Sequence, residues 1–205
     1  MNTQLIEHLL SLPVQLVAVT KKHTKEEVDA LYTLGVRTFG ENRVQEFLEK
    51  YDPNYSWHII GHLQTNKVKY IIDKVDMIES VDSLKLASEI EKQAKKIGKV
   101  QDILIELKVS DDPNKTGLPL EDLDDLLEKV DQMEHVRLRG LMCIASNTED
   151  TQKIEHEFDT MHSLYHDLQQ KRDHIDTLSM GMSHDYPIAI EHGANTIRVG
   201  TALFE

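Results

Sequence analysis

The stretch Leu16-Val17-Ala18-Val19-Thr20-Lys21 is a short apolar run, rich in β-branched residues, that ends in a lysine. Such runs are typical of a strand that is buried on both faces. Side chains alternate along a strand, so Val17, Val19 and Lys21 share one face, and Lys22 points away from Lys21. Two alternatives follow. Either both lysines are solvated, as is usual for this residue type, or Lys21 turns into an apolar pocket, where an amine can react with a carbonyl group.

Outward from this strand, the sequence alternates between strand and helix patterns. Thr24 and Glu27 form a capping box that predicts a helix after the first strand, and Gly35 stands where that helix should end. After the third strand, an apolar stripe at helical spacing predicts another helix, with Val68, Ile71, Ile72 and Val75 inward. Eight strands are predicted in all, at residues 16–21, 36–42, 57–61, 77–81, 102–109, 136–145, 177–182 and 196–204.

Eight successive strand–helix units predict an α/β protein, a (β/α)8 or TIM barrel. No helix is predicted after the eighth strand, but a short N-terminal helix on Leu5, Ile6, Leu9 and Leu10 could fill that gap in the ring. Barrels of this kind rarely have fewer than about 200 residues. The 205 residues are therefore expected to form a single barrel domain, with nothing left for a second one.

Composition excludes several classes of partner. The formal net charge is −13, so no basic surplus is available for nucleic acid or an anionic membrane surface. Cys143 is the only cysteine, which precludes an internal disulfide and fits a reducing compartment. The N-terminus lacks the pattern of a secretion signal, and no apolar run approaches the ~20 residues that span a bilayer. A soluble cytoplasmic protein is expected.

In a TIM barrel, the functional residues lie at the carboxyl ends of the strands. Here those ends carry Lys21, Asn42 and Arg198, together with small or hydroxylated residues at the last two strands, Ser183, Gly200 and Thr201. This is the place where barrels commonly bind phosphate, and Gly200 lets backbone N–H groups approach an oxyanion. A phosphate group near a lone lysine suggests pyridoxal 5′-phosphate (PLP), held as an imine. Geometry alone leaves this a suggestion, because a fold does not determine a function.

Six motifs together give this sequence a specific resemblance to a known protein family. They cover residues 18–21 (AVTK), 39–46 (FGENRVQE), 57–64 (WHIIGHLQ), 138–142 (LRGLM), 178–183 (LSMGMS) and 198–201 (RVGT). Together they resemble the pyridoxal phosphate homeostasis protein family, whose fold is that of the N-terminal barrel of alanine racemase. The resemblance runs along nearly the whole chain.

The resemblance implies a role for each site residue. Lys21 would form the internal aldimine with PLP, and Arg198 would face the pyridine nitrogen. Ser183, Gly200 and Thr201 would hold the phosphate, and Asn42 would lie near the ring. No metal is expected.

Three functions remain open on this sequence. One is a barrel that has lost the cofactor and serves as an interaction module, which the presence of Lys21, Ser183, Gly200 and Thr201 disfavours. The resemblance implies a protein that binds and buffers PLP without efficient catalysis, because a ring nitrogen that faces a permanently charged arginine cannot readily take a proton. The alternative is a PLP-dependent amino-acid racemase, although in racemases the second acid/base comes from another domain. PLP-dependent apoenzymes are possible partners, and a monomer is the default expectation, with a dimer left open.

Four histidines and Cys143 could each have either a functional or a structural role. His162 and His166 are four residues apart on a helix, as two metal ligands can be, but no third ligand is evident and a solvated face is expected. His58 and His62 flank the end of the third strand, where a structural role is more common than a catalytic one. Cys143 lies in an apolar strand and is expected to pack as a small hydrophobe.

Overall fold

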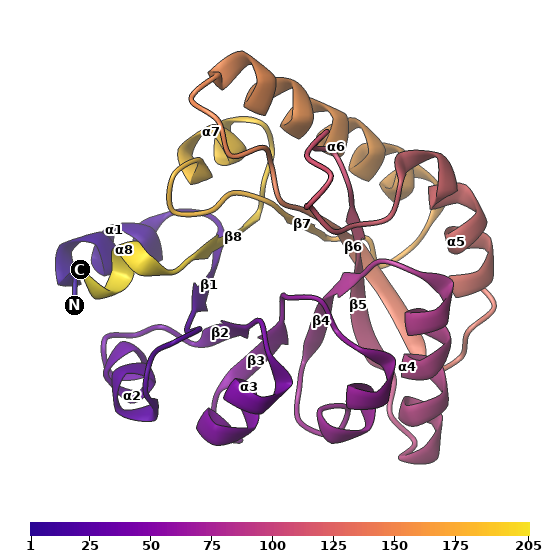
Figure 1. Ribbon diagram of the computed structural model, residues 1–205, viewed down its shortest axis with the longest axis horizontal. Helices are drawn as coiled ribbons and strands as arrows, with labels where there is room; N and C mark the ends of the chain where they lie inside the picture. Colours follow the sequence, from indigo (N-terminus) through magenta and orange to yellow (C-terminus); the bar gives the residue numbers. More distant parts are fainter.

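A computed structural model describes all residues, 1–205. The strands close into one barrel, in which each strand pairs in parallel with its neighbours in sequence and β8 pairs with β1. Helices surround the barrel (Figure 1). The (β/α)8 prediction is therefore confirmed. The strands are β1 (Gln15–Val19), β2 (Thr38–Glu41), β3 (Ser56–Ile59), β4 (Met77–Val81), β5 (Gln101–Leu107), β6 (Val136–Cys143), β7 (Thr177–Ser179) and β8 (Thr196–Val199).

The helices begin where the capping residues predict. Thr24 and Glu27 form the expected capping box, and Gly35 follows the helix with a positive φ of 104°. No helix is long and apolar enough to cross a membrane. The α-helices are α1 (Thr3–Ser11), α2 (Lys25–Thr33), α3 (Val44–Lys50), α4 (Leu84–Lys96), α5 (Leu123–Val130), α6 (Thr151–Lys171), α7 (Tyr186–Glu191) and α8 (Thr201–Phe204), and the 3₁₀ helices are η1 (Thr65–Tyr70) and η2 (Leu120–Asp122).

The N-terminal helix closes the ring, as predicted, but it shares the task with α8. The two helices lie side by side at the edge of the molecule (Figure 1), and the backbone N–H of Asn2 donates to the carbonyl oxygen of Leu203 at 2.9 Å. Leu203 and Ile6 are fully buried. The last strand is correspondingly shorter than predicted, because the backbone turns at Gly200 (ψ −97°) and ends β8 at Val199.

The connection after β3 also differs from its prediction. The apolar stripe is buried as expected, from Val68 to Val75, but the backbone forms 3₁₀ helix η1 and turns instead of an α-helix. A 3₁₀ helix rises about 2.0 Å per residue against about 1.5 Å for an α-helix. The short connection between β3 and β4 thus returns along the barrel with fewer residues.

The barrel interior holds small apolar clusters together with buried charged side chains. Met77, Leu104 and Met142 form one small interior cluster, and Val17, Val19 and Ile60 form another. The outward side chains of the strands pack against the helices in a core of 48 buried residues. Charged side chains occur inside as well, and they need partners there because burying an unpaired charge is costly.

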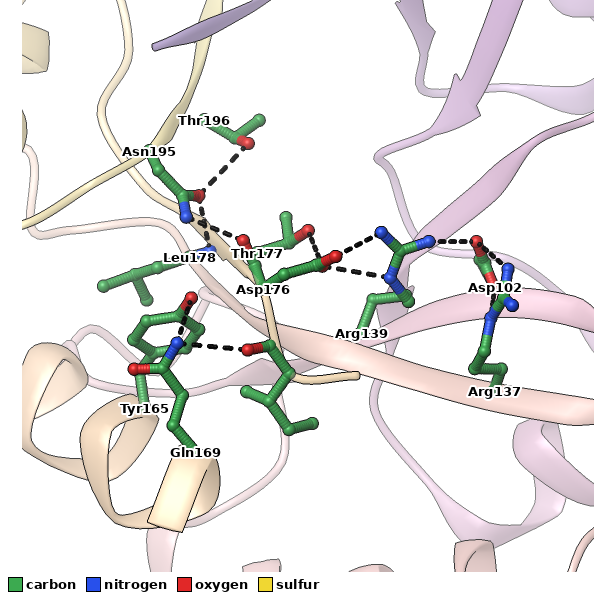
Figure 2. Close-up of polar contacts among 11 residues, drawn as sticks. Asp102, Arg137, Arg139, Tyr165, Gln169, Asp176, Thr177, Leu178, Asn195 and Thr196 are labelled. Atoms are coloured by element: carbon green, nitrogen blue, oxygen red, sulfur yellow. Dashed lines mark hydrogen bonds and ion pairs between the residues drawn. The ribbon is translucent and has the colours of Figure 1, made fainter. Parts of the chain in front are cut away.

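An ion-pair network links β5, β6 and the start of β7 near the amino-terminal ends of these strands (Figure 2). Arg139 of β6 bridges Asp102 of β5, at 2.6 Å, and Asp176, which precedes β7 and is bound through both guanidinium Nε and Nη2. Arg137 donates to both carboxylate oxygens of Asp102, at 2.6 and 3.0 Å. In the same view, the Asn195 side chain joins β7 to β8 by accepting from the N–H of Leu178 at 2.8 Å.

Candidate cofactor site

The six predicted site residues come from four strands that are neighbours in the barrel, in the order β7, β8, β1, β2. Each residue lies within or just beyond the carboxyl end of its strand. The register pairs Ala18 with Val199 on one side of β1, and Val19 with Gly40 on the other. The fold thus gathers residues that are up to 180 positions apart in sequence. They are Lys21, Asn42, Ser183, Arg198, Gly200 and Thr201.

Gly200 and Ser183 are in direct contact. The backbone N–H of Gly200 lies 3.3 Å from the Ser183 hydroxyl oxygen, and Thr201 follows as the exposed first residue of α8. A Cβ on Gly200 would lie 3.1 Å from Cβ of Val19, so only glycine fits easily against β1. The Ser183 loop is held by buried Asp185, which accepts from the N–H of Met182 at 2.6 Å. This corner presents N–H and hydroxyl groups at the position where barrels bind phosphate.

Arg198 lies inside the barrel and is only 3% exposed. Its guanidinium donates to the Ser179 hydroxyl at 2.6 Å and to the carbonyl oxygen of Cys143 at 2.7 Å. The Glu79 carboxylate, 3.9 Å away, supplies the opposite charge. These contacts fix the plane of the guanidinium and compensate its charge in the barrel interior.

Glu79 is the centre of this interior network. The carboxylate is 2.7 Å from Nδ1 of His58 and accepts from the Ser179 hydroxyl at 2.6 Å. Burial alone would raise the pKa of Glu79, but the contacts with His58 and Ser179 and the charge of Arg198 outweigh it, so that the pKa is lowered. Glu79 therefore remains the counter-ion of Arg198.

Lys21 and Lys22 are both exposed, in a turn that follows the end of β1 at Val19. The alternative in which Lys21 turns into an apolar pocket is therefore wrong, because the strand ends two residues too early to carry the lysine inward. The exposed position still lies at the mouth of the barrel. Lys21 comes two residues after Val19, the residue that packs against Gly200.

Asn42 directly follows β2 and packs closely against Gly61, where an added Cβ would lie 2.6 Å from the Asn42 carbonyl oxygen. The side chain is half-buried, and its Oδ1 is buried without a hydrogen-bond partner. Asn42 also lines a surface hollow of about 310 Å³ together with Arg43, Gln45 and His62. An unpaired buried acceptor is costly to the fold, and it is available to a ligand that carries a donor.

The interior partners of Arg198 were not predicted from the sequence. A signal was present, because Glu79, Glu106 and Arg198 each interrupt an otherwise apolar strand. Charges in such strands must meet one another inside a barrel. Which of them meet depends on the register between strands, and that is not visible in a single sequence.

The remaining candidate residues are four histidines and Cys143, and they are either buried in the core or exposed on the surface. His58 is buried beside Glu79, whereas His62 is exposed and lies 3.5 Å from Asp82. His162 and His166 are exposed on α6, and no group of three or more His, Cys, Asp or Glu side chains is arranged to hold a metal ion. Cys143 is fully buried, as predicted.

Comparison with known proteins identifies the family of this chain. The model of the alanine racemase N-terminal domain family matches residues 1–205. A pyridoxal phosphate homeostasis protein from Aquifex aeolicus is 42% identical over 195 residues, which cover 93% of this chain and 86% of the relative.

Solved structures show the same fold. PipY of Synechococcus elongatus, in a structure described as having PLP bound, superposes with a TM-score of 0.92 at 34% identity, over the full length of both chains. An alanine racemase from Clostridium difficile matches 99% of this chain and 58% of its own length, with a TM-score of 0.79 at 18% identity, and it shows the fold alone. Fold, motifs and identity together establish that this chain belongs to the pyridoxal phosphate homeostasis protein family, built on the alanine racemase N-terminal barrel.

Proposed function

We propose that this protein binds PLP at the carboxyl end of its single barrel domain and takes part in PLP homeostasis in the cytoplasm. One observation carries the proposal. The Ser183–Gly200 corner packs against Val19, two residues before Lys21, so that oxyanion donors and a free amine occur at one edge of the barrel. The PipY structure described as having PLP bound supports this assignment.

The residues present fit the cofactor. When bound, PLP supplies an aldehyde that reacts with amines and an aromatic ring that withdraws electrons. The Lys21 amine would bond to the aldehyde carbon with loss of water. The hydroxyls of Ser183 and Thr201 and the N–H of Gly200 would hold the phosphate, and the unpaired Oδ1 of Asn42 would accept from a donor at the ring edge.

Arg198 supports binding without efficient turnover. The guanidinium stays charged at any physiological pH, and Ser179, Cys143 and Glu79 hold it in place. A fixed positive charge at the pyridine nitrogen would keep that nitrogen unprotonated. The protein would then store the cofactor and deliver it, with PLP-dependent apoenzymes as recipients, and it would act as a monomer.

A visible absorption spectrum, followed by borohydride reduction and peptide mass mapping, tests the binding. We expect a yellow protein whose reduced adduct lies on Lys21, and loss of both signals in Lys21→Ala. A protein that stays colourless after addition of PLP would overturn the proposal.

The absence of efficient catalysis needs a separate assay. Optical rotation of L-alanine or L-serine incubated with the PLP-loaded protein should stay constant. Sustained loss of rotation would show that the protein is a racemase.

A further inference from the structure

Two adjacent exposed lysines follow β1, and the proposed function uses only one of them. Lys21 and Lys22 have the same chemistry and similar exposure, so neither burial nor charge distinguishes them. The choice between them must come from the direction in which the turn presents each amine.

Helix α3 holds both peptide groups that flank Lys21. The carbonyl oxygen of Thr20, on one side, accepts from Nζ of Lys50 at 2.6 Å. The N–H of Lys22, on the other side, donates to Oε2 of Glu46 at 2.9 Å. Lys50 and Glu46 themselves approach to 4.0 Å. With both flanking peptide groups tied to one helix, the backbone of Lys21 has little freedom to rotate.

Lys50 is an unusual anchor, because it is only 5% exposed. Its ammonium also donates to Oε1 of Glu41 at 2.5 Å, and the Thr20 hydroxyl donates to the same oxygen at 2.6 Å. A buried ion pair of this kind adds little net stability, because desolvation offsets the attraction. Such a pair does fix geometry, and here it fixes the residue before Lys21.

Lys22 has a backbone conformation that needs support. Its φ is +66°, in the left-handed region that non-glycine residues rarely adopt because it is sterically strained. The N–H of His23 donates to the carbonyl oxygen of Thr20 at 3.1 Å and closes the turn, and the Glu46 contact holds the strained residue. Without Glu46, the turn would relax and the two lysines would change direction.

We infer that Glu46 and Lys50 of α3 are positioning residues that hold the Thr20–Lys22 turn and thereby select Lys21 over Lys22 for the bond to PLP. The inference rests on the proposed function. It extends that function from the residues that touch the cofactor to a helix on the outside of the barrel.

Glu46→Ala is the direct test, with PLP and pyridoxamine 5′-phosphate as probes. Pyridoxamine 5′-phosphate carries the same ring and phosphate but has no aldehyde, so its affinity does not depend on the direction of the lysine. We expect Glu46→Ala to weaken PLP binding about tenfold, the scale of one hydrogen bond to a charged group, and to change pyridoxamine 5′-phosphate binding less than about twofold.

Borohydride trapping and mass mapping supply the second readout. The ratio of adduct on Lys21 to adduct on Lys22 should fall about tenfold or more in Glu46→Ala, in step with the lost affinity. Glu46→Gln keeps an acceptor oxygen and should restore the wild-type ratio. Glu46→Asp keeps the charge but is one methylene shorter, so it should resemble Glu46→Ala, and it carries the test if the alanine variant does not fold.

Glu49→Ala is the matched control, because Glu49 lies on the same helix and contacts only Gln45. It should behave as the wild type. An unchanged trapping ratio in both Glu46→Ala and Glu46→Asp, or an equal loss of affinity for both probes, would overturn the inference. Failure of the proposed function itself would look different, because the wild type would then take up no PLP.

Discussion

At the scale of single residues, the structure separates buried ionisable groups that have a partner from those that do not. Glu79 is surrounded by His58, Ser179 and Arg198, and its pKa is lowered. Glu106 is 2% exposed, and its only side-chain hydrogen bond is from Thr116 at 2.7 Å. The two glutamates therefore have opposite effects on stability as the pH changes.

Burial is the main cause of the raised pKa of Glu106, and repulsion by Asp82 adds to it, against the hydrogen bond from Thr116 and the charge of Arg198. The folded state then binds this proton more tightly than the unfolded state, so stability falls as the pH rises through the raised pKa. The side chain in Glu106→Gln cannot ionise, so stability no longer falls for this reason as the pH rises. Its amide oxygen still accepts a hydrogen bond from Thr116. We expect the variant and the wild type to be similar near pH 4, and the variant to be the more stable at pH 7.

Urea unfolding of both proteins across this pH range measures the difference. Glu134→Gln, at an exposed position, should show no such trend. A stability difference that is constant with pH, or one that favours the wild type at pH 7, would contradict the assignment.

Burial also raises the pKa of the Cys143 thiol, because it disfavours the charged form of the group. It raises this pKa to about 12, so that roughly one thiol in ten thousand is ionised at pH 8. We expect the native protein to be inert to a thiol-specific disulfide reagent and to release about one equivalent per chain after unfolding. Fast stoichiometric reaction of the native protein would show that β6 opens readily.

At the scale of elements, β6 and β7 approach each other unusually closely at Gly140. Its φ is +152°, and an added Cβ would lie 1.7 Å from the carbonyl oxygen of Thr177, its partner across the two strands. The register between β5 and β6 also shifts beside this glycine, after Ile103. Gly140 thus lies where β6 contacts both of its neighbouring strands, β5 and β7.

Gly140→Ala should lower the free energy of unfolding by more than about 3 kcal/mol, because the strands must separate to admit a methyl group. Gly98→Ala is the control. Gly98 also has a positive φ, of 65°, but nothing lies within 4 Å of its added Cβ, so the cost should be about 1 kcal/mol. Chemical denaturation measures both variants, and equal losses would refute the steric argument.

At the scale of the whole molecule, the candidate site and the arginine–aspartate network lie at opposite ends of the barrel. The carboxyl end carries the candidate site, and the amino end carries the network of Asp102, Arg137, Arg139 and Asp176 (Figure 2). The pKa of Asp176 is lowered, because the contacts with Arg139 and Thr177 outweigh the effect of burial. Removal of Arg139 would leave Asp176 without its guanidinium partner, whereas Asp102 would keep Arg137.

Arg139→Ala should therefore lower the free energy of unfolding by about 1–2 kcal/mol, a modest loss because the pairs are partly exposed to solvent. Affinity for PLP should stay within about twofold of the wild type, since the change is made at the opposite end of the barrel. Urea unfolding and PLP titration of one preparation measure both quantities. A large loss of affinity in a folded variant would show that the two ends are coupled.

Local sequence determined most of the elements of this protein. The Thr24 capping box and the Gly35 helix end are short-range features that formed where they were predicted, and the eight strands formed in the predicted order, although β8 ends at Val199 rather than at Phe204. The motifs likewise indicated Lys21, Arg198, Ser183 and the family, although the site residues remain proposals.

Tertiary structure decided what depends on the distance between remote segments. The pairing of Glu79 with Arg198, the end of β8 at Gly200 and the exposure of Lys21 all follow from strand register and ring closure. The two peptide groups held by Glu46 and Lys50 are a further example, since α3 reaches the Lys21 turn only after β1 and β2 have paired. Such contacts join residues that share no local pattern, and only the closed barrel brings them within hydrogen-bonding distance.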